Sequence, residues 1–181
     1  MGIGNPAKFK QENYRLLSAW QHGGGAAGDA PAHRVSVVRA DAPNRVGGNA
    51  QTEAMKKVAG SLRLDLAAFR ELEAFAQLGT DLDAGTQRQL DRGYRMVEIL
   101  KQPQYSPLKV EEQVVVIYAG VKGYLDGVEV GKIRAFEEQF LNDIRSTGSD
   151  ILDAIRTEKV LSEATETKLK AFLDKFAKTF A

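Results

Sequence analysis

An arginine just before a glycine pair is the first arrangement in this sequence that could do chemistry. The segment is Arg45-Val-Gly-Gly48, and a helical pattern begins directly after it. A guanidinium is permanently charged and binds phosphate or carboxylate oxygens, and the N–H groups at a helix start also favour anions. The segment could therefore form an anion site. A solvated arginine in a linker explains the same residues.

A second unusual segment is the polar connection Lys101-Gln-Pro-Gln-Tyr-Ser-Pro-Leu108 between two expected helices. Pro103 and Pro107 lack an amide hydrogen and would stiffen the segment. A rigid helix–helix loop is a sufficient interpretation of these residues.

A self-contained phosphate or metal site is not expected. The glycine-rich residues 23–28 are followed by Asp29, whereas a phosphate-binding loop ends in Gly-Lys-Ser/Thr. The sequence has no cysteine, and its two histidines, His22 and His33, lack the spacing of metal ligands. We therefore expect no metal site and no enzyme activity from this protein alone.

Two pairs of adjacent carboxylates are also poor candidates for acid–base catalysis. They are Glu111/Glu112 and Glu137/Glu138, and neighbouring helix positions do not face each other. We expect these side chains to be solvated or to complement a helix dipole.

The elements that would position these residues are helices. Residues 49–181 are predicted to form an all-α bundle of about five to six helices, with no strand after Arg45. Residues 1–48 are expected to be an irregular, partly disordered head and linker, with at most one short helix within residues 9–20 and one short strand within residues 35–38.

The apolar spacing and the capping residues predict the individual helices. The expected features are, in order, an apolar face at Leu62, Leu66, Phe69, Leu72 and Ala76; an N-cap at Asp83; a helix over Val110–Leu125, apolar nearly all round and so central in the bundle; a helix from Ile133 ending near Gly148; a short helical turn at Asp150–Arg156; and a last helix capped by Ser162.

Charge and hydropathy exclude other classes of protein. The net charge is +1, without the clustered basic surface of a nucleic-acid binder. No run of eighteen apolar residues exists, so we expect no direct membrane insertion. A protein of the cytoplasm is the simplest interpretation.

Long blocks of residues 45–181 resemble the alpha subunit of F-type ATP synthase. The blocks that carry the resemblance are Arg45-Val-Gly-Gly48, Ala54–Ala67, Arg70–Gln77, Asp81–Asp83, Arg92-Gly93, Glu98–Pro107, Glu111–Gly120, Gly123–Asp126, Phe136–Glu138 and Leu161–Glu163. The resemblance implies a subunit that alternates with the catalytic beta subunit in a ring around a rotating central stalk, with this C-terminal helical domain at the membrane-facing end.

The resemblance also implies roles for three residues. Arg45 matches the arginine that reaches into the neighbouring beta site and stabilises charge on the transferred phosphate, as an arginine finger does. Gln102 and Gln104 match the glutamines that hold adenine at the non-catalytic nucleotide site. ATP or ADP and Mg would be bound by the intact complex, and no cofactor is expected for this protein alone.

The sequence departs from the family before Arg45. Ala42-Pro43-Asn44 stands where the family has Ser-Val-Ser on a strand, and residues 1–41 show no resemblance. The family's barrel domain, phosphate-binding loop and magnesium-binding strand have no counterpart here.

We therefore expect a truncated alpha subunit that contributes to proton-driven ATP synthesis only within the complex, with beta and the central stalk as partners and a place peripheral to the inner membrane. The alternative is a free-standing helical interaction module without nucleotide binding. Exposed apolar patches on a lone domain would also favour self-association.

Overall fold

A computed structural model of the protein describes residues 32–33, 51–77, 82–102 and 108–180. The helices in these ranges are α4 (Glu53–Gln77), α5 (Ala84–Ile99), α6 (Val110–Val121), α7 (Ile133–Thr147), α8 (Ser149–Glu158) and α9 (Glu163–Phe180), with a short 3-10 turn η1 (Val130–Lys132) before α7. These six helices confirm the predicted all-α bundle. The predicted boundary at residues 48–49, the short helix within residues 9–20 and the short strand within residues 35–38 lie outside the described ranges.

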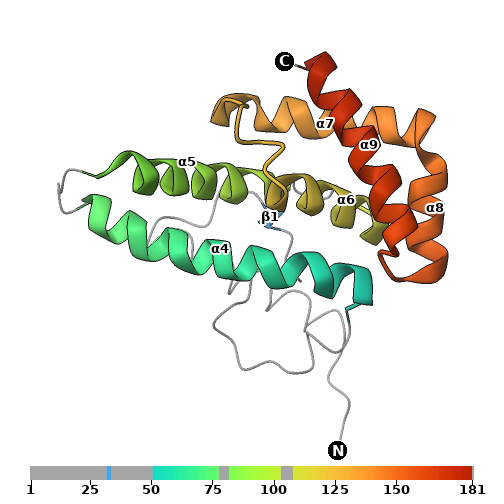
Figure 1. Ribbon diagram of the computed structural model, residues 1–181, viewed down its shortest axis with the longest axis horizontal. Coiled ribbons are helices and arrows are strands. Elements are labelled where there is room, and N and C mark those ends of the chain that lie inside the picture. The colour runs from blue at the N-terminus through green and yellow to red at the C-terminus, as the bar shows by residue number, and fades with distance from the viewer. Residues whose placement is uncertain (1–31, 34–50, 78–81, 103–107, 181) are drawn as a thin grey trace, which may run out of the picture.

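Helix α6 forms the centre of the bundle, as its apolar composition predicts. It contacts α4, α5, α7 and α8, and its six consecutive residues Val114–Ala119 are all buried. Figure 1 shows α4 running beneath α5 and α6 along the length of the molecule. Helices α7, α8 and α9 lie together on the right of the view. A helix buried on every side needs apolar residues all round, which is the pattern the sequence shows.

The predicted helix Val110–Leu125 is four residues too long, because α6 ends at Val121. Gly123 adopts the left-handed backbone conformation with φ of +84°, which glycine accepts without steric cost. Arg92 on α5 caps the end of the helix, since its Nη2 donates to the carbonyl oxygen of Val121 at 2.5 Å. The backbone therefore turns here rather than continuing as a helix.

Helices α4 and α5 approach each other closely at Gly93. A Cβ atom at this position would lie 2.0 Å from Cδ2 of Phe69, so only glycine allows the observed packing. The Phe69 ring also meets the Tyr94 ring edge to face, with centroids 5.0 Å apart. Leu62, Leu66 and Phe69 are buried as predicted, whereas Leu72 is only half-buried towards the end of α4.

Five phenylalanines pack α7 against α9. Their ring centroids lie between 5.1 and 6.1 Å apart, the range in which aromatic pairs attract each other. They are Phe136, Phe140, Phe172, Phe176 and Phe180. This cluster fixes the last helix on the bundle.

The caps of three helices confirm the sequence prediction, and one helix corrects it. The Asp83 carboxylate accepts the N–H groups of residues 85 and 86 at the start of α5, Gly148 ends α7, and the Ser162 hydroxyl accepts the N–H of Thr165 at 3.4 Å. The expected short turn at Asp150–Arg156 is instead the ten-residue helix α8, because its apolar side packs on α6, α7 and α9.

A two-residue antiparallel pairing accompanies the helices and leaves the all-α prediction in place. Strand β1 (Ala32–His33) pairs with β2 (Lys101–Gln102), with Ala32 opposite Gln102 and His33 opposite Lys101. Such a short pairing has no alternation of apolar residues from which it could be predicted.

None of the described helices is long and apolar enough to cross a membrane.

Candidate functional site

The residues predicted to contact nucleotide fall largely outside the described ranges. Arg45 and Gln104 both lie in segments that the structure does not describe. The backbone of Gln102 forms part of β2, which follows α5 after a single residue. The structure therefore places the backbone of Gln102 close to the end of α5, and the positions of Arg45 and Gln104 lie outside the described ranges. Their roles remain predictions.

The two ends of the connection between α5 and α6 are held by side chains. At its start, Lys101 Nζ lies 2.5 Å from Glu98 Oε2. At its end, Gln113 Nε2 donates to the carbonyl oxygen of Leu108 at 2.8 Å, and the Lys109 N–H donates to Glu112 Oε2 at 3.1 Å. Both ends of this connection are thus tied to the adjoining helices.

Of the two roles predicted for Glu111 and Glu112, the structure confirms the helix-dipole role and excludes the solvated one. They are 7% and 6% exposed. Arg156 Nε donates to Glu111 Oε1 at 3.0 Å, and Arg145 Nε donates to Glu112 Oε1 at 2.8 Å. They do lie in the first turn of α6, where carboxylates suit the helix dipole. The two pairs tie the start of α6 to α8 and α7.

Two competing effects set the ionisation of Glu112. Burial raises the pKa of its carboxyl, but the hydrogen bonds from Arg145 and the Lys109 backbone lower it more, so the pKa of Glu112 lies below its ordinary value. The carboxylate therefore stays ionised and paired, which disqualifies it as a general acid.

Glu166 on α9 is the centre of a second charged group that joins three helices. Its Oε2 lies 2.7 Å from Lys57 Nζ, and its Oε1 accepts from the Tyr118 hydroxyl at 2.9 Å. Lys122 Nζ and Lys170 Nζ lie 3.8 and 3.5 Å from Oε1. The hydrogen bond from Lys57 is the largest effect on this carboxyl and outweighs burial, which leaves the pKa of Glu166 at about 2.

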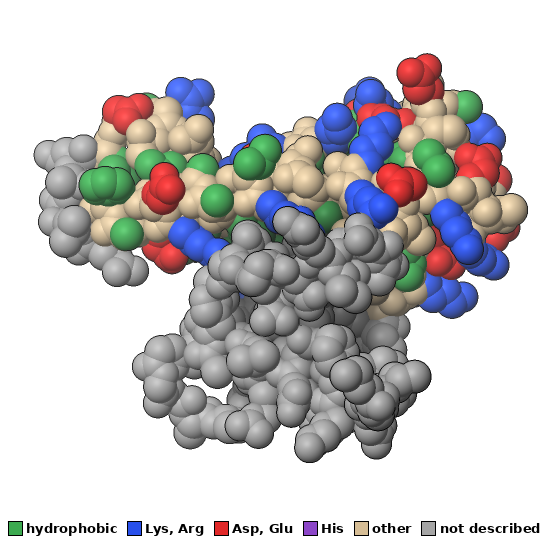
Figure 2. All heavy atoms as spheres, turned by 90° about the horizontal axis from the view of Figure 1, so that it is seen from below, with side chains coloured by type: hydrophobic (Ala, Val, Ile, Leu, Met, Phe, Trp, Pro, Cys, Tyr) green, Lys and Arg blue, Asp and Glu red, His purple; other side chains and the backbone are tan. Residues whose placement is uncertain are grey.

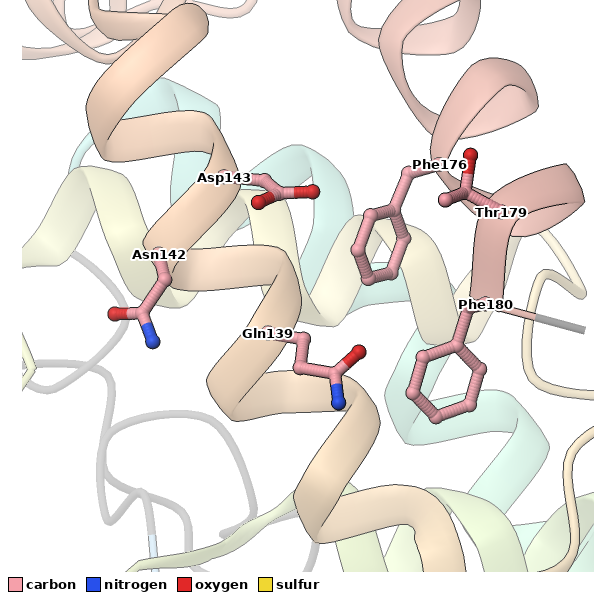
Figure 3. A pocket seen from close by; sticks show the side chains of 6 residues that line it. All are labelled: Gln139, Asn142, Asp143, Phe176, Thr179 and Phe180. Atoms are coloured by element: carbon pink, nitrogen blue, oxygen red, sulfur yellow. The ribbon is translucent and has the colours of Figure 1, made fainter.

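A shallow hollow of about 340 Å³ lies between α7 and α9. Its lining comprises Gln139, Asn142, Asp143, Phe176, Thr179 and Phe180. Figure 3 shows the two phenylalanine rings facing α7, with the carboxylate of Asp143 directed towards Phe176 and the amide of Gln139 towards Phe180. Its lining residues include no serine, cysteine or histidine that could form a catalytic pair.

Helix α4 presents large apolar side chains to solvent. Leu64 is 75% exposed and Phe75 is 58% exposed. Their separation of eleven residues is about three helical turns, so both lie on one side of α4. Figure 2 shows exposed apolar side chains gathered at the end of the molecule formed by α4 and α5, whereas Lys and Arg side chains are more frequent over the opposite half.

Across the described part of the protein, no three His, Cys, Asp or Glu side chains form a group that could hold a metal ion. The charged groups described above join helices to one another. The exposed features are the side of α4 that carries Leu64 and Phe75 and the lysines around Glu166, which are Lys57, Lys122 and Lys170.

Sequence reasoning missed both ion-pair groups. A glutamate three residues after Lys109 is a recognisable helix-start signal, and it could have indicated that Glu112 turns back to the backbone. Nothing local indicates the Glu166 group, because Lys57 lies 109 residues away and Tyr118 lies 48 residues away.

Comparison with protein families gives a match that covers most of the helical bundle. The family model described as "ATP synthase alpha/beta chain, C terminal domain" matches residues 51–176. The match covers all of α4 to α8 and most of α9.

Proposed function

Since this protein belongs to the family of C-terminal domains of ATP synthase alpha and beta subunits, we propose that it acts as the alpha-type domain, which contributes to proton-driven ATP synthesis only within the assembled complex. The observation that carries this proposal is the continuous family match over residues 51–176. The 181 residues also contain no Gly-Lys-Ser/Thr sequence for a phosphate-binding loop.

The alpha type, rather than the beta type, is proposed from sequence. The segment Lys101-Gln-Pro-Gln-Tyr-Ser-Pro107 and the Arg45-Val-Gly-Gly48 segment resemble the alpha subunit. In this role Arg45 stabilises charge at a neighbouring beta site, and Gln102 and Gln104 lie on the adenine side of a non-catalytic site. ATP, ADP and Mg are bound by the complex, so the isolated protein has no measurable affinity for ATP.

The partners in this proposal are the beta subunit and the central stalk, in a complex peripheral to the inner membrane. The apolar side chains of Leu64 and Phe75, which are 75% and 58% exposed on one side of α4, support a contact role, because apolar side chains gathered at a surface mark interaction sites. The same observation supports a second candidate, a free-standing interaction module that binds other proteins without nucleotide.

Co-expression with an affinity-tagged beta subunit and the central stalk subunit tests the proposal. The untagged protein should co-purify with them, and the double substitution Leu64→Ser/Phe75→Ser should reduce the recovered amount severalfold. A matched control is Val130→Ser/Val160→Ser, which removes two exposed apolar side chains from connections outside α4. The control should behave as the unmodified protein does.

Three outcomes separate the candidates. Retention of the protein by beta and the stalk supports the alpha-type role. No retention, together with capture of other proteins that is lost in the α4 variant but kept in the control, favours the free-standing module. Micromolar binding of Mg-ATP by the isolated protein, measured by calorimetry, would contradict both.

A further inference from the structure

Three lysines from different parts of the sequence surround the carboxylate of Glu166. Lys57 comes from α4, Lys122 follows the end of α6 and Lys170 comes from α9. All three ammonium nitrogens lie within 3.8 Å of a Glu166 oxygen. The side chain of Glu166 is 14% exposed, whereas the three lysine side chains are about half exposed. One largely enclosed carboxylate therefore gathers three positive charges at the surface.

The charges of this group do not balance. Glu166 supplies one negative charge against three positive ones, and its carboxylate already accepts hydrogen bonds from Lys57 and the Tyr118 hydroxyl. The next carboxylate along α9, Asp174, accepts the hydroxyl of Tyr124 at 2.8 Å. Within the group a surplus of two positive charges remains, and Asp174, which stays negatively charged while it accepts a hydroxyl, offsets part of it from one turn beyond Lys170. Lys57 donates both to Glu166 and to the carbonyl oxygen of Leu161, so the donors that remain available are mainly those of Lys122 and Lys170.

The low pKa of Glu166 is consistent with the positive charges close to it. The hydrogen bond from Lys57 is the largest effect that lowers this pKa, and burial acts in the opposite direction. The hydrogen bond from the Tyr118 hydroxyl and the charge of Lys170 lower the pKa further. An anionic group that approaches the exposed side of the lysines meets the same positive field.

The geometry selects the kind of anion. Lys122 and Lys170 are the more weakly engaged lysines, at 3.8 and 3.5 Å from Glu166, and they come from different parts of the bundle. A lysine ammonium group is a compact charge on a flexible stem, without the fork that grips a single carboxylate or phosphate. Both ammonium nitrogens lie near the same oxygen, Oε1 of Glu166, and are therefore close to each other. A segment with two neighbouring carboxylates offers one negative charge to each of them.

We propose that Lys122 and Lys170, gathered by Glu166, form a docking site for an acidic segment of a partner protein that presents at least two neighbouring carboxylates. Lys57 keeps Glu166 in place, through its 2.7 Å contact and its hydrogen bond to the carbonyl oxygen of Leu161 at 3.3 Å. This site goes beyond the proposed role in ATP synthesis, because it rests on the described side chains alone and does not require assembly with beta or the stalk.

A titration of the full-length protein with a hexaglutamate peptide tests the site. The probe is followed by ¹H–¹⁵N NMR at low salt, and the chemical-shift changes should centre on the backbone amides near residues 122 and 170. The variant Lys122→Gln/Lys170→Gln removes the surplus charge and leaves the contacts of Lys57 and Tyr118 with Glu166 intact. It should bind the peptide about threefold to tenfold more weakly, since each exposed ion pair contributes modestly.

The matched control is Lys175→Gln/Lys178→Gln. Both lysines are exposed on α9 and the net charge falls by the same amount. Binding should stay within about twofold of the unmodified protein, because charges outside the group act only through screened, long-range attraction. Circular dichroism confirms that both variants keep the helical fold.

Three results would overturn the inference. The first is equal weakening in the two variants, which means non-specific attraction to net charge. The second is inorganic phosphate shifting the same amides while the peptide does not, which means a small-anion site. The third is an absence of localised shifts in the unmodified protein up to millimolar peptide. A peptide affinity that depends on salt in the unmodified protein and in the control, but not in Lys122→Gln/Lys170→Gln, supports the site.

Discussion

Replacing Arg145 with alanine should destabilise the folded protein by about 2 kcal/mol at neutral pH, because it leaves the Glu112 carboxylate buried without its charged partner. Glu112 is 6% exposed, and Arg145 Nε donates to its Oε1 at 2.8 Å. Breaking a fully buried ion pair costs about 3–5 kcal/mol. The estimate here is lower because Arg145 is 44% exposed, so water screens part of the interaction, and because the Lys109 N–H still donates to Glu112.

The same pair sets a pH dependence of known sign. The pKa of Glu112 in the folded protein lies below its ordinary value of 4.5. Its ionised form therefore stabilises the fold above about pH 4.5, and this contribution is lost as the pH falls through the folded pKa. The stability difference between the unmodified protein and Arg145→Ala should be full at pH 7 and should shrink as the pH falls below 4.5.

Urea unfolding followed by circular dichroism at pH 7 and at pH 3 measures both effects. The control is Arg134→Ala, whose partner Glu138 lies on the same helix and is exposed. It should cost less than about 0.5 kcal/mol at either pH. If Arg145→Ala costs no more than the control at pH 7, or if its cost is the same at pH 3, the buried pair does not stabilise the fold as argued.

Three further predictions test packing and charge elsewhere. Gly93→Ala should lower the free energy of unfolding by about 1–3 kcal/mol, because its Cβ would collide with Phe69. Gly60→Ala has nothing within 4 Å of its Cβ and should raise the free energy of unfolding by about 0.5–1 kcal/mol. Thermal unfolding of both variants measures the contrast, and equal effects would contradict it. Phe140→Ala, at a fully buried position, should cost about 3–5 kcal/mol by urea unfolding; a loss below about 1 kcal/mol would show that the aromatic cluster is not tightly packed. The carboxyl group of Glu166 should titrate with a pKa of about 2 in ¹³C NMR, so its ion pairs should persist down to about pH 2, and a midpoint above pH 4 would refute the lysine arrangement.

The start and end of several helices follow from local sequence. Asp83 and Ser162 accept N–H groups at the starts of α5 and α9, and Gly148 ends α7. These signals act within one helical turn, so they can be recognised without the fold. The predicted end of α6 lies beyond its true end at Val121, because Arg92, which caps the helix, lies 29 residues earlier in the sequence.

The candidate site was less predictable than the fold. Sequence resemblance directed attention to Arg45, Gln102 and Gln104, of which the described structure contains only the backbone of Gln102. It gave no weight to Glu112 and Glu166, which look like ordinary charged residues at the start of a helix. Both carboxylates gain their significance from partners on other helices.

The sequence by itself determined that this protein is a helical bundle with α6 at its centre, because apolar spacing and caps are local properties of a helix. It also carried the resemblance that the family match over residues 51–176 supports. Only the tertiary structure decided which charges are buried and which are gathered at the surface. Glu112 meets Arg145 across 33 residues and Glu166 meets Lys57 across 109; no local pattern encodes such pairs, since they form only when packing of the apolar faces brings distant helices together.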